Sequence, residues 1–282
     1  PSGLYESEIA LDAHRVNLRR FVRLQIHHPD ITLILDHNQR SDAEAWVTGS
    51  PCRLGMERPG ESRPLLTSVW TIPDTFDERK VHQSRVVESF LRFFGLEADP
   101  DFRPLTPPVA GPGETSTLAP GPVIGLLCDP PGNPALDWPI ENWRRLATEL
   151  MAEPGRPHLV FPGLHGPPGR METLAGYLPP NRFTRPPERM NLAGFASALS
   201  RCDLVIAPDD DGLHLANALG VPVIGLYGPS NPVRTGPIFR APCRIVLPPG
   251  SRPTGGVPMS CLRPDSVLQA VRRHLHRSAA AA

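Results

Sequence analysis

The densest group of chemically active side chains is the run Asp209-Asp210-Asp211, with His214 three residues further on. One carboxylate is enough to cap a helix and to stabilise its positive end, and three exceed what that role needs. Mutual repulsion among adjacent carboxylates favours a bound cation, a network of sugar hydroxyls or one raised pKa. We therefore expect a binding function for the aspartates, whereas a lone histidine inside a helix is normally a packed side chain.

Loops rich in glycine, proline or small polar residues follow four apolar, strand-like runs. These loops cover residues 129–137, 162–166, 208–212 and 228–231. In an open parallel sheet, ligands bind beyond the carboxyl ends of the strands. Glycine lets a backbone approach a ligand closely, and a helix that begins after such a loop offers its free N–H groups to a phosphate. Together the loops predict one ligand site, although each loop alone is also typical of an ordinary turn.

Apolar strand-like runs alternate along the chain with segments of helical period, which is the pattern of parallel α/β folds. In the first part of the chain, the pattern predicts helices over 11–26 and 81–95 and a strand over 31–35. In the second part, it predicts strands over 123–127, 158–161, 204–207 and 221–227. The helices expected there begin near Trp138-Pro139 and cover 192–199, 213–219 and 264–275.

A proline-rich stretch over residues 98–122 separates these two parts. It has no helical period and little apolar content, which is typical of a linker. The length of 282 residues is also about two domains' worth of chain, at roughly 100–200 residues per domain. We therefore predict an N-terminal domain over 1–97, a linker over 98–122 and a C-terminal domain over 123–282.

Composition excludes several classes of protein. The 29 basic residues balance the 29 acidic ones, which disfavours nucleic-acid binding. No apolar run approaches the ~20 residues of a membrane helix, and the N-terminus lacks the features of a secretion signal. The five cysteines are scattered without a CxxC pair, so neither a disulfide framework nor a zinc site is expected. No GxGxxG follows a strand and no P-loop lysine is present, which disfavours other nucleotide-binding classes. We expect a soluble cytoplasmic protein.

Residues 199–237 read LSRCDLVIAPDDDGLHLANALGVPVIGLYGPSNPVRTGP. This run resembles the signature of glycosyltransferase family 9, the ADP-heptose:lipopolysaccharide heptosyltransferases, which combines D-[ST]-G-x-x-H-L-A with a later G-P-[ST]-D-P. Residues 132–143 are similar to the family's donor loop and the helix after it. Residues 30–55 and 82–95 resemble parts of its first domain, and 261–274 resemble its closing helix. The resemblance covers nearly the whole chain.

The resemblance implies a GT-B fold, with two Rossmann-like domains whose parallel sheets face each other across a cleft. The second domain would bind a nucleotide-sugar donor, most simply an ADP-sugar, and the first a glycan, glycolipid or small-molecule acceptor. Members invert the anomeric centre and need no obligatory metal. An acidic residue of the first domain deprotonates the acceptor hydroxyl, and the second domain holds the leaving diphosphate. A lipid-linked acceptor would bring the enzyme to the inner face of the cytoplasmic membrane as a peripheral protein without a membrane span.

The expected donor site takes residues from the four loops and from the helix after the aspartates. Its members are Gly132, Asn133, Trp138, Gly163, Asp209, Asp210, Asp211, Gly212, His214, Gly228, Pro229 and Ser230. No catalytic residue and no metal ligand is assigned. A magnesium ion at the three aspartates is the less favoured alternative.

Departures from the family pattern leave a second hypothesis open. We find no counterpart of the family's first β-α-β unit, which contains the usual catalytic aspartate, and Leu136 stands where the donor loop has lysine. Asp210 and Asp211 replace Ser/Thr and Gly, and two extra carboxylates near a diphosphate carry a Coulomb penalty. The alternative is a catalytically degenerate GT-B protein that acts as a binding or scaffolding subunit. The retained His214 and the Gly-Pro-Ser loop favour the enzyme.

Overall fold

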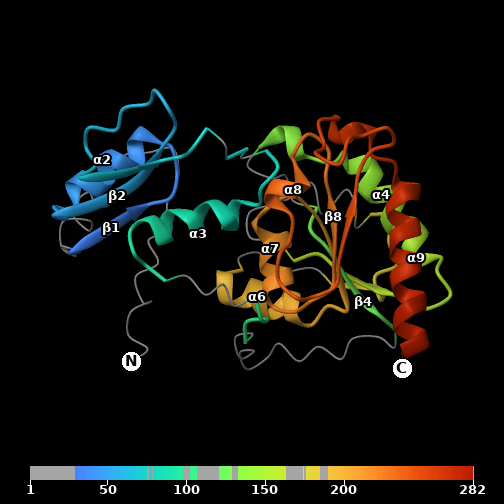
Figure 1. The fold of residues 1–282 in the computed structure, drawn as a ribbon. Helices are drawn as coiled ribbons and strands as arrows, with labels where there is room; N and C mark the ends of the chain where they lie inside the picture. The colour runs from blue at the N-terminus through green and yellow to red at the C-terminus, as the bar shows by residue number, and fades with distance from the viewer. Residues whose placement is uncertain are drawn as a thin grey trace. The chain divides into compact units, whose positions relative to one another are not determined.

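The computed structural model shows an α/β protein whose described residues form two compact units (Figure 1). The described residues are 29–74, 76–77, 79–97, 102–106, 121–128, 133–162, 174, 176–184 and 190–281. The first unit contains the described residues up to 77 and those from 84 to 97, and the second contains 79–83 and those from 102 onward. The helix expected over 11–26 lies outside the described residues.

The first unit contains a parallel sheet of β1 (Ile31–Ile34), β2 (Cys52–Glu57) and β3 (Ser68–Thr71), in that order. Helix α2 (Gln39–Val47) follows β1, and the side chain of Asn38 caps it by accepting from the Arg40 amide at 3.0 Å. Helix α3 (Gln83–Phe93) places its apolar residues against side chains of β2 and β3. The strand predicted over 31–35 and the helix predicted over 81–95 are therefore confirmed.

A buried ion pair holds the loop after β2 in the first unit. Arg63 and Asp42 are 7% and 2% exposed, and the guanidinium binds both carboxylate oxygens, with Arg63 Nε 2.9 Å from Asp42 Oδ2. The same guanidinium donates to the carbonyl oxygens of Asp36, at 2.7 Å, and of Met56. Each charge is thus neutralised and hydrogen-bonded, as burial requires.

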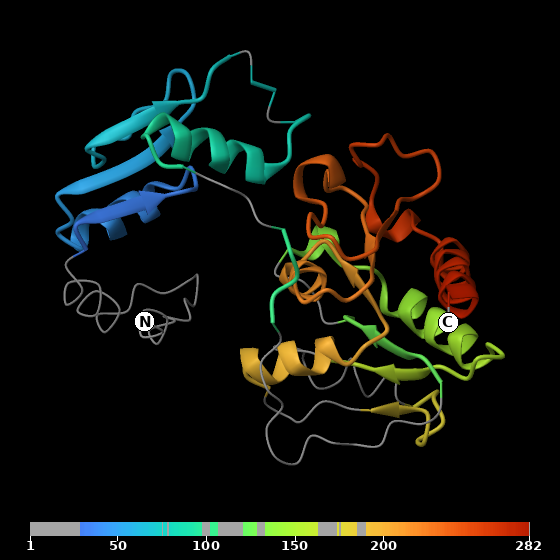
Figure 2. The same cartoon turned by 60° about the horizontal axis from the view of Figure 1, so that its bottom comes forward.

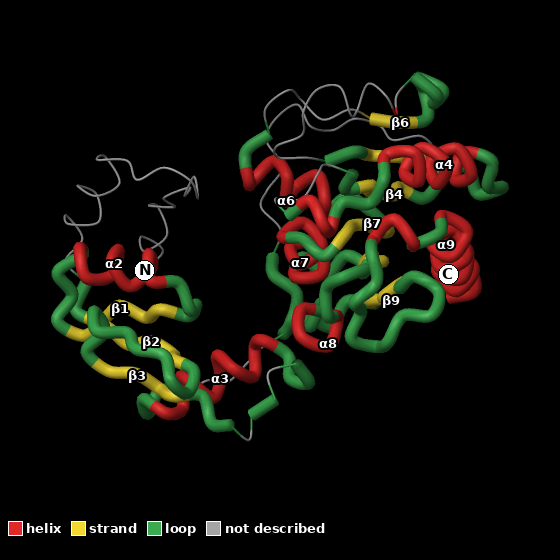
Figure 3. Tube along the Cα trace, turned by 90° about the horizontal axis from the view of Figure 1, so that it is seen from above, coloured by secondary structure: helices red, strands yellow, loops and turns green. Residues whose placement is uncertain are grey.

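The second unit contains a parallel sheet in the order β6-β5-β4-β7-β8-β9 (Figure 3). Its strands are β4 (Val123–Leu126), β5 (His158–Val160), β6 (Phe183–Thr184), β7 (Leu204–Pro208), β8 (Val223–Leu226) and β9 (Cys243–Val246). The strands predicted over 123–127, 158–161, 204–207 and 221–227 are confirmed, whereas β6 and β9 were not predicted. Two parallel sheets also confirm the predicted α/β class.

Helices cover both faces of this second sheet. Helices α4 (Ile140–Met151) and α9 (Pro264–Ala281) lie side by side on one face, and α6 (Leu192–Ser200) and α7 (Asp211–Ala218) lie on the other (Figures 2 and 3). The short helix α8 (Pro232–Thr235) follows β8, and two 3-10 turns occur at Pro134–Leu136 and Met259–Cys261. These positions agree with the four helices predicted in this part of the chain.

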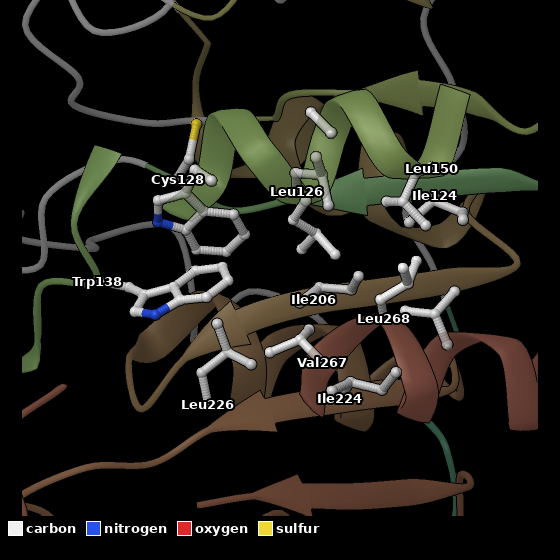
Figure 4. Close-up of a cluster of buried hydrophobic side chains, with 14 of the residues drawn as sticks. Ile124, Leu126, Cys128, Trp138, Leu150, Ile206, Ile224, Leu226, Val267 and Leu268 are labelled. Atoms are coloured by element: carbon white, nitrogen blue, oxygen red, sulfur yellow. The ribbon is translucent and has the colours of Figure 1, made fainter. Parts of the chain in front are cut away.

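Alternate strand residues enter the two cores, because successive side chains of a strand point to opposite faces. Ile124 and Leu126 of β4 point toward α4 and α9, beside Val267 and Leu268 of α9 (Figure 4). Val205 of β7 belongs to the opposite core, with α6 and α7. The strands are therefore apolar on both faces, which explains why they read as continuous hydrophobic runs.

The strand order of this sheet reverses direction between β4 and β7. From β4 the chain proceeds outward through β5 and β6, then returns to the other side of β4 for β7, β8 and β9. The segments that leave the carboxyl ends of β4 and β7 therefore diverge and leave room for a ligand beyond the sheet edge. Among the described residues, no helix has both the length and the apolar character needed to cross a bilayer.

A short part of the expected linker, residues 102–106, belongs to the second unit and is hydrogen-bonded within it. The Leu105 amide donates to the Ala218 carbonyl at 2.6 Å, and the Phe102 carbonyl accepts from the Arg240 amide at 3.2 Å. The Phe102 ring also meets Phe239 edge-on, with 6.0 Å between centroids. Residues 98–101 and 107–120 lie outside the described residues, and the linker over 98–122 stays a prediction.

Candidate functional site

A carboxylate and an imidazole face each other beyond the end of β7. Asp209 directly follows the last strand residue, and its Oδ1 lies 3.5 Å from Nε2 of His214 on α7. Its Oδ2 accepts a hydrogen bond from Thr235 Oγ1 of α8 at 2.9 Å. The Asp209 side chain is only 9% exposed, whereas the His214 side chain is 41% exposed. Asp209 therefore connects α7 with α8 and supports an imidazole that solvent or a ligand can reach.

Asp209 is ionised at neutral pH although it is largely buried. Burial raises the pKa of this carboxyl, but the contact with His214 and the hydrogen bond from Thr235 lower it by more, so its pKa lies below the ordinary value. Burial, followed by the charge of Asp209, raises the pKa of Tyr227, whose hydroxyl donates to the Thr235 carbonyl at 3.0 Å. The site thus has a fixed anion surrounded by hydrogen-bond donors.

Asp210 has a different role from that of its neighbour. Its side chain caps α7, because Oδ1 accepts from the Leu213 amide at 3.0 Å. Burial, together with the negative charge of Asp211, raises the pKa of Asp210 to about 6 despite that hydrogen bond. Of the three alternatives that the crowded acids left open, the raised pKa is the one seen at Asp210, with burial rather than repulsion as the larger cause.

The three aspartates do not converge on a common point. Asp209 supports His214, Asp210 caps α7, and Asp211 is exposed in the first turn of that helix. Within the described part of the chain, no three His, Cys, Asp or Glu side chains are grouped so that they could hold a metal ion.

Gly212 lets the start of α7 pack tightly against the end of β4. A Cβ at this position would lie 2.5 Å from Cδ1 of Leu127 and 3.2 Å from Cζ of Phe195. Leu127 follows β4, so the close approach brings the first turn of α7 to the edge where the strand order reverses. The positive end of the helix dipole is then placed where an anion can bind.

The loop after β8 is held by the residues before the last helix. The Gly228 carbonyl accepts from the amides of Gly256 and Val257 at 2.9 and 3.2 Å. A Cβ on Gly228 would lie 2.9 Å from the backbone nitrogen of Met259. Gly228 is therefore needed for packing within the protein. Pro229 is exposed and Ser230 is half-buried beside Asp209.

The expected residues of the donor loop after β4 are partly described. Asn133 is exposed and caps the turn that follows it, accepting from the Ala135 amide at 3.0 Å. Trp138 has no exposed surface; its Nε1 donates to the Leu262 carbonyl at 2.9 Å, and its ring stands edge-on to Trp143 (Figure 4). In this structure Trp138 supports the loop from the core and offers no surface to a ligand. Gly132 and Gly163 lie outside the described residues.

Sequence reasoning missed three residues that surround the expected ones. Thr235 donates to Asp209, Tyr227 donates to the Thr235 carbonyl, and both residues fall inside the run over 199–237 that carries the family resemblance. His82 donates from Nε2 to the Gly236 carbonyl at 2.8 Å, although the two residues are 154 positions apart. The signature run could have indicated the first two residues, whereas no sequence spacing indicates the third.

The arrangement suits a ligand that contains both a phosphate group and hydroxyl groups. The exposed His214 imidazole can donate to phosphate oxygens, and the positive end of the α7 dipole favours an anion beside it. The exposed Asn133 side chain offers an oxygen atom that can accept from hydroxyl groups.

Comparisons with known proteins identify the family. Residues 23–247 match glycosyltransferase family 9 (heptosyltransferase). The chain is 38% identical over 104 residues to lipopolysaccharide heptosyltransferase 1 of Pseudomonas aeruginosa, which covers 37% of this chain and 28% of that protein. It is 27% identical over 128 residues to lipooligosaccharide heptosyltransferase 2 of Haemophilus influenzae, which covers 44% of this chain and 36% of that protein. The matched segments thus span well under two thirds of these relatives.

Solved structures show the same fold. The E. coli heptosyltransferase WaaC with ADP superimposes with a TM-score of 0.65 and 21% identity, over 91% of this chain and 77% of that one. E. coli ADP-heptose lps heptosyltransferase II gives a TM-score of 0.66 and 22% identity, over 93% of this chain and 81% of that one. Because the family match extends over most of the sequence, the chain belongs to glycosyltransferase family 9, the heptosyltransferase family.

Proposed function

We propose that this protein is an inverting glycosyltransferase that transfers a heptose-like sugar from an ADP-sugar to an acceptor hydroxyl. Membership of the family supports the reaction class. Solved relatives are described with ADP and with ADP-2-deoxy-2-fluoro heptose, which supports the choice of donor. The observation that carries the proposal is the Asp209–His214 pair, which lies at the first turn of α7 where the strand order of the sheet reverses.

The donor site of this proposal lies at the carboxyl edge of the second sheet. His214 and the positive end of the α7 dipole would bind the diphosphate, and Asp209 would hold His214 in place. Gly132, Asn133 and Gly163, in the loops after β4 and β5, would complete the site, together with Pro229 and Ser230. Negative charge that develops on the leaving diphosphate is stabilised by these donors during transfer.

Asp210 relieves part of the repulsion that its carboxylate would exert on a diphosphate. Its pKa is raised to about 6, so an approaching anion needs only a small further shift to protonate it at neutral pH. Its Oδ1 accepts from the Leu213 amide, which turns one oxygen toward the helix. Asp211 is exposed, where solvent and salt screen its charge. The two extra carboxylates are therefore compatible with an anionic donor.

The acceptor belongs to the first domain in this proposal, with residues 1–97 as the acceptor side, 98–122 as linker and 123–282 as the donor side. An acidic group would deprotonate the acceptor hydroxyl, which then displaces the diphosphate with inversion. The names of the relatives specify lipopolysaccharide or lipooligosaccharide, so we propose a glycolipid acceptor that brings the reaction to a membrane surface.

Calorimetry with ADP-, GDP- and UDP-sugars, each with and without Mg²⁺, tests the donor assignment. We expect ADP-sugars to bind best and Mg²⁺ to change their affinity little. An absence of heat with every nucleotide would contradict donor binding. A transfer assay with a glycolipid acceptor then tests the chemistry, and NMR of the product should show an inverted anomeric centre.

One observation favours the alternative, a catalytically degenerate binding subunit. Leu136, in the turn after Asn133, stands where the family pattern has lysine, so this loop offers no cation at that position. ADP-sugar binding without transfer to any acceptor would favour that alternative.

A further inference from the structure

Residues Arg79–Gln83 belong to the second unit, although they precede α3 in the chain. Two hydrogen bonds attach this segment to α8, the helix that follows the Gly-Pro-Ser loop. Asn231 donates from Nδ2 to the Arg79 carbonyl at 2.7 Å, and His82 donates from Nε2 to the Gly236 carbonyl at 2.8 Å. No residue of this segment was expected at the donor site.

The two hydrogen bonds hold opposite ends of α8. Asn231 is the N-cap of this helix, and its Oδ1 accepts from the Val233 amide at 3.0 Å while its Nδ2 binds Arg79. Gly236 is the C-cap, and its amide donates to the Pro232 carbonyl at 2.9 Å while its own carbonyl binds His82. A helix of four residues has few internal hydrogen bonds, so these external ones determine much of its position.

The position of α8 is transmitted to the Asp209–His214 pair. Thr235 is the last residue of α8, and its hydroxyl binds Asp209 Oδ2 at 2.9 Å. The other oxygen of that carboxylate lies 3.5 Å from His214 Nε2. A continuous path of contacts therefore runs from His82 through Gly236, Thr235 and Asp209 to His214.

The imidazole of His82 is suited to a neutral donor role. Burial lowers its pKa, its hydrogen bond to the Gly236 carbonyl raises it, and the charge of His214 lowers it again, with a net shift below the ordinary value. His82 is thus neutral at neutral pH, and the proton on Nε2 is the one that the Gly236 carbonyl accepts.

We propose that His82 is a positioning residue for the donor's diphosphate: its hydrogen bond to Gly236 fixes α8 and thereby orients Asp209 and His214. This inference rests on the proposed function, because the diphosphate is its ligand. Its geometric part, the fixing of α8, can be measured without any ligand.

Two substitutions distinguish the effect of losing the hydrogen bond from the effect of losing the imidazole ring of His82. His82→Ala removes the donor, whereas His82→Gln is also neutral and keeps an N–H at a similar distance from the backbone. His158→Ala is the matched control. His158 also binds through Nε2, to Thr184 Oγ1 at 2.7 Å; it is buried where His82 is half-buried, and it lies at the amino end of β5, away from the carboxyl ends of the strands.

The first measurement is amide hydrogen exchange of Thr235 and Gly236 in the protein without ligand. Loss of one hydrogen bond should accelerate exchange of these amides about five- to tenfold in His82→Ala. His82→Gln should restore the native rate within about twofold, and His158→Ala should leave it unchanged. Equal exchange in His82→Ala and the native protein would overturn the proposal.

The second measurement is calorimetric titration with ADP. We expect ADP to bind about five- to tenfold more weakly to His82→Ala, with affinity restored by His82→Gln and unaffected by His158→Ala. Native affinity in His82→Ala, or equal weakening in the Ala and Gln variants, would overturn the proposal. If the native protein does not bind ADP, the proposed function fails, and the exchange rates alone decide whether His82 fixes α8.

Discussion

The Nε2 atom of His214 lies 3.5 Å from Oδ1 of Asp209, and the imidazole is exposed while the carboxylate is not. Burial would ordinarily neutralise such a carboxyl, but hydrogen bonding keeps its pKa below the ordinary value. Because the hydrogen bond from Thr235 fixes the Asp209 carboxylate, the carboxylate can fix the position of the His214 imidazole. Of the three adjacent aspartates in the sequence, Asp209 is therefore the one that supports the His214 imidazole.

Asp209→Asn should impair sugar transfer far more than Asp211→Asn, although both remove one negative charge. The first change breaks the contact with His214 and weakens the acceptor for Thr235, so kcat/KM should fall at least about tenfold. Asp211 is exposed, and its loss should change kcat/KM by less than about threefold. Steady-state kinetics with an ADP-sugar measures both. Equal losses of kcat/KM in the two variants would show that the overall charge matters and that the Asp209–His214 contact does not.

Asp210→Asn should make the protein more stable above pH 6 and less dependent on pH. The pKa of Asp210 is raised to about 6 in the fold, so its contribution to stability is fully present below about pH 4 and is lost as pH rises through about 6. Asparagine keeps the cap on the Leu213 amide without a charge, and the gain at pH 8 can reach about 3 kcal/mol. Urea unfolding of the native protein and of Asp210→Asn between pH 4 and 8 measures this difference in stability.

Asp210→Ala is the control for that experiment. It also removes the charge but loses the N-cap, so it should be about 1 kcal/mol less stable than Asp210→Asn at every pH. A free energy of unfolding for Asp210→Asn that follows the native pH profile would contradict the raised pKa.

The sequence predicts the second sheet well because its strands are apolar on both faces and each ends at a loop residue. Strands β6 and β9 were not predicted because they lie at the two lateral edges of the described sheet, where burial imposes little pattern. The residues of the site also differ in how well the sequence predicts them. Asp209 and His214 are five residues apart and visible as a motif, whereas His82 and Gly236 meet only through the tertiary fold.

Trp138 shows a further limit of sequence reasoning. The tryptophan-proline pair in the expected donor loop indicated a donor contact by its resemblance to the family pattern. Its side chain is buried because Leu262, 124 residues away, accepts its indole hydrogen and Trp143 packs on its ring. A motif identifies which residues belong to a site, but only the packing partners tell whether a side chain faces the ligand or the core.

Gly228→Ala should distort the loop after β8 and lower stability. The new Cβ would lie 2.9 Å from backbone atoms of Met259, which cannot turn aside as a side chain can, and overpacking of this kind costs about 1–3 kcal/mol. Gly155→Ala is the matched control, because its Cβ would meet nothing nearer than Cδ of Pro122 at 4.0 Å. Thermal unfolding compares the two. If Gly228→Ala unfolds at the native temperature, the loop is not held as described.

Asp42→Ala should destabilise the first unit strongly, because it leaves the buried charge of Arg63 without its partner. Breaking such a pair costs about 3–5 kcal/mol. Glu61→Ala breaks the exposed contact with Arg58 and should cost about 1 kcal/mol or less. Hydrogen exchange of the β2 amides measures both effects, and similar exchange rates in the two variants would contradict a structural role for the buried pair.

The most direct test of a donor site at the edge of the second sheet is NMR mapping of the backbone amides during titration with ADP. ADP should shift the amides of Gly212 and Leu213 at the start of α7 and that of Ser230 after β8, while those of Gly155 and His158 at the opposite edge stay in place. Saturable shifts confined to the opposite edge or to the first unit, with none at α7, would contradict the assignment of the site.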